Sequence, residues 1–135
     1  MNKNLNCIML VDDNPDDNYF HERAINQANL TTFVIKKSTA QEGLHHLKLK
    51  EGNTCPHPDL IFLDINMPGM NGWEFLKEYN QLDKSVQSKA VIIMLTTSEN
   101  AEDIERAHGC SVSDFITKPL TKEKMIIVNE KYFNS

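Results

Sequence analysis

The stretch that decides the fold is Leu60-Ile61-Phe62-Leu63, an unbroken apolar run that ends at Asp64. A second run, Val91-Ile92-Ile93-Met94-Leu95, repeats the pattern further along the chain. A strand with one face in solvent alternates apolar and polar residues, whereas a strand covered by helices on both faces is apolar throughout. We therefore expect these two runs to be central strands of a parallel sheet.

Three further strand-length runs complete this sheet, and helix-like stretches separate all five. Strands that alternate with helices are typical of an α/β fold. We predict a doubly wound, five-stranded parallel sheet with helices on both faces. The expected strands are residues 7–11, 32–35, 60–63, 90–95 and 114–117.

Residues at the expected helix starts favour the same organisation. Asn14 is a candidate cap, followed by Pro15 at the first helical position and by Asp16 and Asp17 in the first turn. Thr39 with Glu42 forms the pattern of a capping box. Candidate caps of the last two helices are Asn100 and Thr121, and Gly109 is a candidate end of the fourth helix.

The last segment leaves two alternatives. Met125-Ile126-Ile127-Val128 is rich in β-branched residues and is compatible with a strand. Met125, Val128 and Tyr132 nevertheless keep the spacing of one helix face.

Length and composition exclude several classes of protein. A chain of 135 residues, 40% hydrophobic and 24% charged, has the size of one globular domain, which we expect to span residues 1–135. It has no long apolar run and no apolar segment near its first residue, so we expect a cytoplasmic protein without membrane insertion. Cys7, Cys55 and Cys110 fit reduced thiols. A net charge of -5 without a basic stripe argues against direct nucleic-acid binding.

Chemically active side chains follow four of the expected strands. In a doubly wound sheet the ligand site lies beyond the carboxyl ends of the strands. We therefore expect three acids, a hydroxyl and an ammonium group at one edge of the sheet. These residues are Asp12 and Asp13, Asp64, Thr96 with Thr97 and Ser98, and Lys118 with Pro119.

Three neighbouring carboxylates repel one another unless a cation neutralises them. Ligation by oxygen alone selects Mg²⁺, or Mn²⁺, and disfavours zinc. A carboxylate can also attack a phosphoryl group, and Asp64, the single acid after a central strand, is the candidate nucleophile. The metal, Lys118 and the Thr96 hydroxyl are candidates to cancel the charge of the phosphoryl oxygens.

These motifs resemble the receiver domain of two-component response regulators. Residues 58–72 are similar to the phosphoacceptor strand and following loop of that family. The acidic pair, Thr96, Phe115 and Lys118-Pro119 occur in the family's order, and the resemblance spans nearly the whole chain. It implies a flavodoxin-like strand order, 2-1-3-4-5, a cis peptide before Pro119, and a stand-alone receiver without an output domain.

The resemblance also implies the roles of individual residues. Asp13, Asp64 and the backbone carbonyl of Asn66 would contact Mg²⁺, with Asp12 acting through water. A sensor histidine kinase or a phosphotransfer protein would phosphorylate Asp64. The receiver would catalyse its own phosphotransfer and autodephosphorylation, and it would be a signalling switch rather than an enzyme.

The expected switch couples Thr96 to Phe115. Thr96 would move toward the phosphoryl group and Phe115 would follow it inward by a steric effect. The surface formed by the fourth helix, strand 114–117 and the last helix would change, and a separate protein would read that change.

Two other functions remain open at this point. A small Mg²⁺-dependent phosphatase would also use an aspartyl phosphate, but such hydrolases carry a second Asp two residues after the nucleophile of the first strand. Here Asp12 and Asp13 are adjacent, and Asn14 stands two residues after Asp12. A degenerate receiver that serves as a scaffold is disfavoured because every expected side chain is present.

Several residues have a simpler structural interpretation. We expect Asp16 and Asp17 to be solvated acids at a helix start. We expect Trp73 to belong to the core, and His45 and His46 to lie at the surface.

Overall fold

The structure is a computed structural model in which five strands and the helices that pack on them are defined. It describes residues 5, 7–30, 33–48, 58–65, 67, 69–82, 91–96 and 112–133. The strands are β1 (Ile8–Val11), β2 (Val34–Lys37), β3 (Leu60–Asp64), β4 (Val91–Thr96) and β5 (Asp114–Thr117). The described helices are α1 (Pro15–Ala28), α2 (Ala40–Lys48), α3 (Gly72–Tyr79) and α6 (Lys122–Tyr132).

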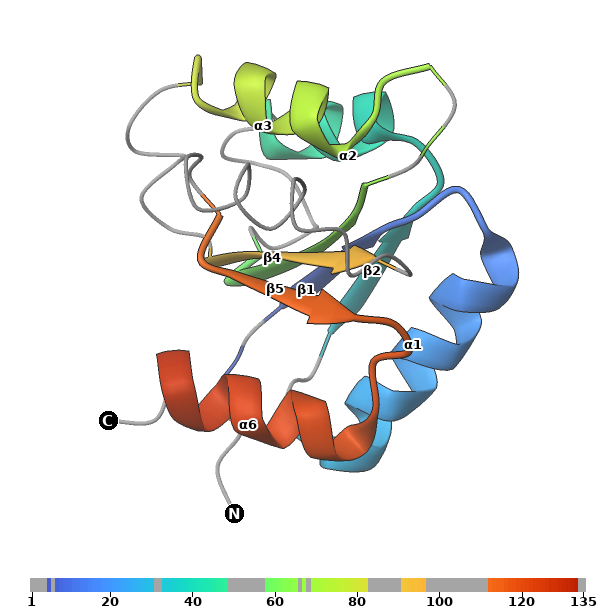
Figure 1. Ribbon diagram of the computed structural model, residues 1–135, viewed down its shortest axis with the longest axis vertical. Helices are drawn as coiled ribbons and strands as arrows, with labels where there is room; N and C mark the ends of the chain where they lie inside the picture. Colours follow the sequence, from blue (N-terminus) through green and yellow to red (C-terminus); the bar gives the residue numbers. More distant parts are fainter. Residues whose placement is uncertain are drawn as a thin grey trace.

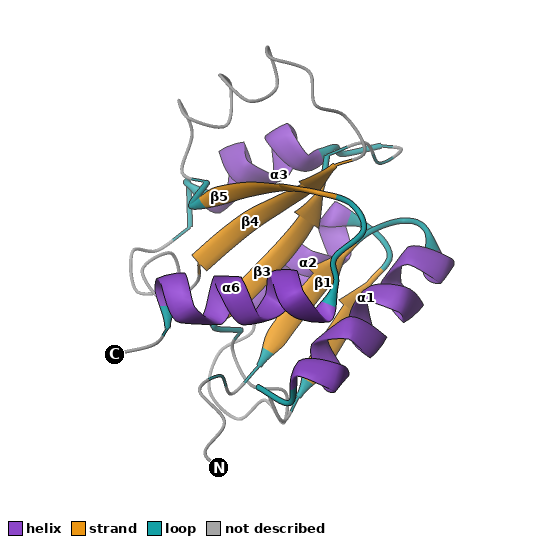
Figure 2. Ribbon diagram, turned by 60° about the horizontal axis from the view of Figure 1, so that its bottom comes forward, coloured by secondary structure: helices purple, strands orange, loops and turns teal. Residues whose placement is uncertain are grey.

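The strands form one parallel sheet in the order β2-β1-β3-β4-β5. Helices α1 and α6 cover one face of this sheet, and α2 and α3 cover the other (Figures 1 and 2). The structure thus confirms the predicted α/β class, the strand order and the layers.

The central strands contribute to two hydrophobic cores, one on each face. Ile61 and Leu63 of β3 pack on the side of α2 and α3, and Leu60 and Phe62 pack on the side of α1 and α6. Every residue of β3 is buried. The unbroken apolar run is therefore a consequence of helices on both faces of the sheet.

The second strand differs from the prediction. It was expected at residues 32–35, but β2 runs from Val34 to Lys37 and pairs Leu10 with Lys36. Because β2 is an edge strand, charged side chains can extend from it into solvent, and Lys36 reaches Glu22 of α1 at 2.8 Å. The apolar run alone did not reveal that two lysines continue the strand.

The helix caps agree with the prediction in most details. The Asn14 side chain accepts hydrogen bonds from the backbone N–H groups of Asp16 and Asp17 at the start of α1. Thr39 accepts from the backbone of Glu42, but the Glu42 carboxylate accepts from Ser38 instead of Thr39, so the expected capping box is only half formed.

The C-terminal segment is helical, which settles the alternative between strand and helix. Met125 and Val128 of α6 are fully buried while Ile127 is 60% exposed, as one apolar helix face requires. Thr121 caps this helix, as expected, and the Lys118–Pro119 peptide bond is cis, as the resemblance implied. The predicted fourth helix, with Asn100 and Gly109, lies outside the described residues.

Candidate functional site

An acidic cluster lies at the carboxyl ends of β1 and β3. The parallel register places Val11 beside Leu63, so Asp12 follows β1 next to Asp64, the last residue of β3. Asp12, Asp13 and Asp64 each offer a carboxylate oxygen, and these oxygens lie within 4.8 Å of one another. Asp12 and Asp64 are buried, whereas Asp13 is exposed. The three acids expected at one edge of the sheet are therefore brought together.

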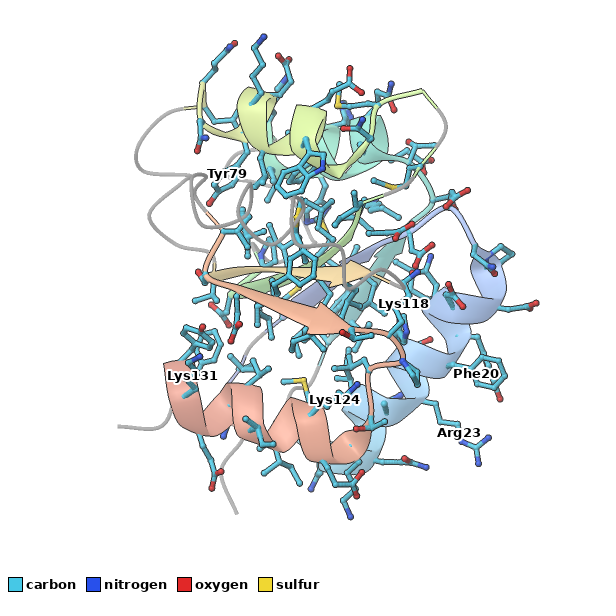
Figure 3. The ribbon with its side chains drawn as sticks, viewed as in Figure 1. Phe20, Arg23, Tyr79, Lys118, Lys124 and Lys131 are labelled. Atoms are coloured by element: carbon cyan, nitrogen blue, oxygen red, sulfur yellow. The ribbon has the colours of Figure 1, made fainter. Side chains whose placement is uncertain are left out.

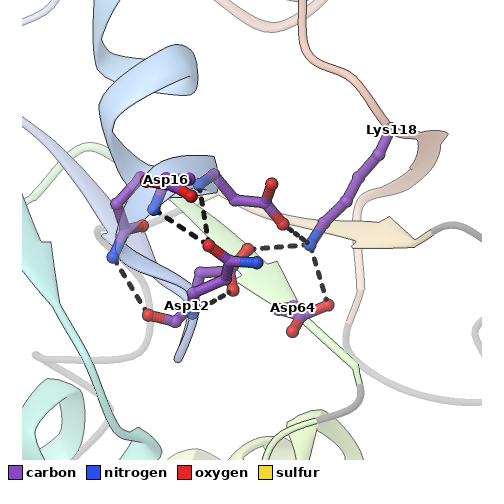
Figure 4. Close-up of polar contacts among 7 residues, drawn as sticks. Asp12, Asp16, Asp64 and Lys118 are labelled. Atoms are coloured by element: carbon purple, nitrogen blue, oxygen red, sulfur yellow. Dashed lines mark hydrogen bonds and ion pairs between the residues drawn. The ribbon is translucent and has the colours of Figure 1, made fainter.

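Lys118, which follows β5, extends its ammonium group into this cluster (Figure 4). Its Nζ lies 2.8 Å from Asp12 Oδ2, 2.9 Å from Asp17 Oδ2 and 3.3 Å from Asp64 Oδ1. The Lys118 side chain is only 11% exposed. One buried ammonium group thus forms ion pairs with acids at the end of β1, in α1 and at the end of β3.

The expectation that Asp17 is merely a solvated acid was wrong. Asp17 lies in the first turn of α1, and only three residues separate this helix from β1. That short connection holds the first turn above the edge of the sheet, where Asp17 reaches Lys118. Asp16 is exposed, as expected.

Two further residues of α1 face the site and were not found from the sequence. Asn18 is buried and donates from Nδ2 to the backbone oxygen of Asp12 at 3.0 Å. His21 is also buried, and its pKa is lowered by burial and by the positive charge of Lys118, which outweigh the opposing effect of Asp12 and Asp17. Their helical spacing with buried Ile25 was the available signal.

The Asp12 carboxylate is held from two sides. Its Oδ1 accepts from the backbone N–H of Asn14 at 2.9 Å, and its Oδ2 accepts from Lys118 at 2.8 Å. These bonds orient the carboxylate before any ligand binds.

Burial and like charges disfavour ionisation of Asp64. Burial is the largest cause that raises its pKa, to about 6, and the negative charge of Asp12 adds to it. Lys118 opposes the shift. Burial alone would lower the pKa of Lys118, but its hydrogen bonds to Asp12 and Asp17 raise it above its ordinary value. The site therefore holds more negative charge than one ammonium group neutralises.

The donor set fits a hard divalent cation. Mg²⁺ takes oxygen ligands at about 2.1 Å in an octahedron, which separates its ligands by roughly 3 to 4 Å. The oxygens of Asp12, Asp13 and Asp64 lie within 4.8 Å of one another, and a cation would offset the burial and the charge of Asp12 that raise the pKa of Asp64. Asn66, whose carbonyl was the fourth expected ligand, lies outside the described residues.

The start of α3 fixes the end of β3. The Gly72 N–H donates to the Ile65 carbonyl at 2.8 Å. A Cβ atom on Gly72 would lie 2.7 Å from the Asp64 carbonyl oxygen and 3.0 Å from Ile65 Cα. A glycine is therefore needed for α3 to begin this close to the candidate acceptor.

The expected switch residues lie on neighbouring strands. Thr96 is the last residue of β4, opposite Thr117, and its side chain lies outside the described part of the chain. Phe115 is half-buried on β5 and packs against the core beneath α2 and α3. Thr97 and Ser98 are also outside the described residues.

Among the residues given a structural role, Trp73 is buried as expected. His45 is exposed, but the prediction that His46 lies at the surface was wrong, because it is only 4% exposed. His46 lies beside Leu47 on the buried face of α2, and the sequence pattern of this helix does not distinguish it from its exposed neighbour.

Comparison with protein families gives the same assignment as the geometry. The family model of the response regulator receiver domain matches residues 8–129. This chain belongs to the response regulator receiver domain family. Members act as phosphoacceptors in two-component signalling, and this is the role of the chain. The comparisons do not support the phosphatase alternative.

Individual relatives of this receiver domain are distant. The probable methanogenesis regulatory protein FilR2 of Methanothrix harundinacea is 29% identical over 119 residues, which cover 87% of this chain and 75% of that protein. The chain spans about half the length of several other curated relatives.

Solved structures show the same fold. A response regulator receiver protein from Dyadobacter fermentans has a TM-score of 0.83 at 28% identity, covering 96% of this chain and 98% of that one. A two-component response regulator from Cytophaga hutchinsonii has a TM-score of 0.86 at 23% identity, covering 97% and 98%. Within the described residues, no helix is both long and apolar enough to cross a membrane.

Proposed function

We propose that Asp64 accepts a phosphoryl group from a phosphohistidine of a sensor histidine kinase or phosphotransfer protein. The observation that supports this most strongly is the position of Asp64, at the end of a central strand and within reach of Asp12, Asp13 and Lys118. An acceptor there has both a positively charged side chain, Lys118, and the acid pair proposed to bind the metal close to it.

The transfer exchanges one bond for another. A carboxylate oxygen of Asp64 forms a bond to phosphorus while the P–N bond of the donor breaks. The electron pair of that bond stays on the imidazole nitrogen, which takes up a proton from solvent. Asp64 must be ionised to attack, so its raised pKa works against the reaction in the metal-free protein.

Asp12, Asp13, Asp64 and the Asn66 carbonyl would hold Mg²⁺, with Asp12 acting through water and Mn²⁺ as a substitute. When bound, Mg²⁺ supplies positive charge that favours the ionised Asp64 and cancels charge on the phosphoryl oxygens. Asn14 and Lys118 hold the Asp12 carboxylate in a fixed orientation, which limits the rearrangement that binding requires.

Lys118 would neutralise the transferred phosphoryl group. Its ammonium is shared among three acids, and Asp17 is the most exposed of them, with 35% of its side chain accessible. A phosphoryl group on Asp64 adds negative charge at this point and attracts the ammonium away from Asp17. The Thr96 hydroxyl would provide a second donor.

We further propose that the phosphorylated state is read by a separate protein on the surface that includes β5 and α6. A hollow of about 260 Å³ lies there, lined by residues that include Phe115, Ile127 and Lys131. Phe115 links this surface to the site if it follows Thr96 inward. We also propose that residues 1–135 form one receiver domain and that this domain catalyses its own phosphorylation. We propose a cytoplasmic location for it.

Incubation with phosphoramidate and Mg²⁺, followed by intact-mass measurement, tests the proposed acceptor. The wild-type chain should gain a labile phosphoryl mass, and EDTA or Asp64→Asn should abolish the gain. An equal gain by Asp64→Asn would show that the acceptor lies elsewhere.

A further inference from the structure

Lys124 of α6 makes two hydrogen bonds that the reaction described above does not use. Its Nζ donates to the Thr117 carbonyl at 2.7 Å and to the Pro119 carbonyl at 3.0 Å. These are the residues immediately before and after Lys118. Figure 3 shows Lys118 just beyond the end of β5 and Lys124 on α6.

The location of Lys124 in its helix is electrostatically unfavourable. Thr121 caps α6 and accepts a hydrogen bond from the backbone N–H of Lys124, which places this lysine in the first helical turn. The positive end of the helix dipole lies there, and a cation at that end is disfavoured. Two carbonyl oxygens offset this cost, because an ammonium group has three donors and charged hydrogen bonds are strong.

The two carbonyls flank the backbone from which the Lys118 side chain extends. Thr117 is the last residue of β5 and pairs with Thr96 of β4, so its backbone belongs to the sheet. The bond to Pro119 ties the far side of Lys118 to the same ammonium group. Together they restrict the backbone of Lys118 while its Nζ lies 3.3 Å from Asp64.

We propose that Lys124 is a positioning residue for phosphoryl transfer: it holds the Lys118 backbone so that the Lys118 ammonium reaches the Asp64 carboxylate. The inference rests on the proposed function of Asp64 and Lys118. It assigns Lys124 no contact with the phosphoryl group. Its effect is on the rate of transfer. We expect little effect on Mg²⁺ binding, because Lys124 bonds to none of the three acids of the cluster and the Asn14 N–H still orients the Asp12 carboxylate.

Three variants separate this role from a general effect on folding or charge. Lys124→Met keeps the length of the side chain and removes its donors, and Lys124→Arg restores donors to both carbonyls. Lys122→Met is the matched control, because Lys122 lies in the same helical turn, is exposed and carries the same charge. The phosphorylation rate is measured at saturating phosphoramidate by intact mass, and Mg²⁺ affinity is measured by calorimetry.

Lys124→Met should lower the maximal phosphorylation rate by about tenfold, as expected for a modest misplacement of a charged group. Its Mg²⁺ affinity should stay within about twofold of wild type, Lys124→Arg should recover most of the rate, and Lys122→Met should change it by less than about twofold. If Lys124→Met reacts like wild type, loses Mg²⁺ affinity in parallel, or is not rescued by arginine, the inference is wrong.

Two further results keep the test decisive. If Lys124→Met melts below the assay temperature, Lys124→Gln is tested instead, with Lys122→Gln as its control. Because glutamine retains a hydrogen-bond donor, Lys124→Gln should be phosphorylated more slowly than wild type but by less than the roughly tenfold expected for Lys124→Met. If the wild type gains no phosphoryl group at Asp64, the proposed function itself fails. Phosphorylated wild type with an unchanged Lys124→Met refutes only the role of Lys124.

Discussion

At the scale of single residues, the charge balance of the site depends on Lys118. The side chains of Asp12 and Asp64 are 5% and 10% exposed, and each has this ammonium group as a close positive partner. A buried carboxylate that loses its partner is costly. The same residues that prepare the site for phosphoryl chemistry therefore make it sensitive to the loss of one charge.

Lys118→Met should lower the free energy of unfolding by about 2 kcal/mol in Mg²⁺-free buffer near pH 7.5, because it leaves two buried carboxylates unpaired. Urea denaturation with and without Mg²⁺ measures the effect, and saturating Mg²⁺ should narrow the difference. Lys36→Met, which breaks an exposed pair with Glu22, should cost less than about 1 kcal/mol. If the two variants lose the same free energy of unfolding, Lys118 does not stabilise the buried carboxylates.

Asp64→Asn should have the opposite effect and stabilise the metal-free protein. Because the pKa of Asp64 is raised to about 6 by burial and by Asp12, its ionised form is disfavoured in the folded state at neutral pH. The gain should be about 1 to 3 kcal/mol above pH 7. It should disappear as the pH falls from 6 to below 4, where Asp64 is protonated in both the folded and unfolded states.

Thermal unfolding of wild type and Asp64→Asn across this pH range provides the measurement. Added Mg²⁺ should stabilise the wild type more than the variant. If Asp64→Asn is less stable than wild type at pH 7.5 without Mg²⁺, the folded protein does not disfavour the ionised form of Asp64.

Residues at strand ends could be predicted from the sequence, but their neighbours on helices could not. Asp12, Asp64 and Lys118 each follow an apolar run, and parallel strands bring such positions to one edge. Asp17 and Asn18 reach the same site because the short connection from β1 holds the first turn of α1 there and because α1 is rotated so that they face the site. The rotation of α1 depends on how the helix packs against the sheet. The acids at the start of the helix do not indicate this packing.

At the scale of elements, close contacts hold the helices that border the site. Helix α3 begins against the end of β3, and the packing leaves no room for a side chain at Gly72. The contact is with backbone atoms of Asp64 and Ile65, which cannot move aside without displacing the strand.

Gly72→Ala should therefore lower the free energy of unfolding by about 2 to 3 kcal/mol. Gly43→Ala is the comparison, because its new Cβ would meet the side chains of Val11 and Phe75, at 3.2 Å and 3.3 Å, and no backbone. Those side chains can adjust, and alanine favours the helix, so Gly43→Ala should change stability by less than about 1 kcal/mol. Chemical denaturation of both variants decides the matter, and an unchanged Gly72→Ala would refute the close packing of α3 on β3.

A polar cluster ties α6 to the start of β5. The Asp114 carboxylate accepts from Lys131 and from the Tyr132 hydroxyl, both at 3.0 Å, and from the backbone N–H of Phe115 at 2.8 Å. Burial acts to raise the pKa of Asp114, but these hydrogen bonds outweigh it and hold the pKa below its ordinary value. The ionised carboxylate is therefore favoured in the folded state.

Asp114→Asn should cost about 1 kcal/mol at pH 7, the net value of such hydrogen bonds. A lowered pKa stabilises the fold above the ordinary pKa of Asp, about 4, and this contribution is lost as the pH falls through the folded-state value. The difference from wild type should therefore shrink in acid. Unfolding of Asp114→Asn between pH 7 and pH 3 tests this, with Glu130→Gln on the exposed side of α6 as a control; a gap that widens in acid would contradict it.

Element boundaries show where sequence patterns lose information. The buried strands β3 and β4 were predicted to within one residue because burial on both faces demands apolar side chains. The edge strand β2 was misplaced by two residues because hydrogen bonding to β1, rather than burial, extends it through Lys36 and Lys37. For α6, the spacing of Met125 and Val128 was a better guide than the β-branched composition.

At the scale of the whole molecule, the sheet order explains why distant parts of the sequence form one site. The order β2-β1-β3-β4-β5 places the ends of β1 and β3 side by side, with β4 and β5 next to them. Lys118 then bridges more than a hundred residues of sequence to reach Asp12. The net charge of -5 is also partly explained, since the acids that would bind Mg²⁺ contribute to it.

The measurement that tests the central claim most directly is the location of the phosphoryl group. Wild-type protein is phosphorylated with phosphoramidate and Mg²⁺ and then treated with sodium borohydride, which reduces an aspartyl phosphate to homoserine. Tandem mass spectrometry should find homoserine at position 64, in amounts that depend on Mg²⁺. Homoserine at position 12 or 13 instead, or a stable phosphoryl group on a histidine or serine, would contradict the assignment of Asp64 as the phosphoacceptor.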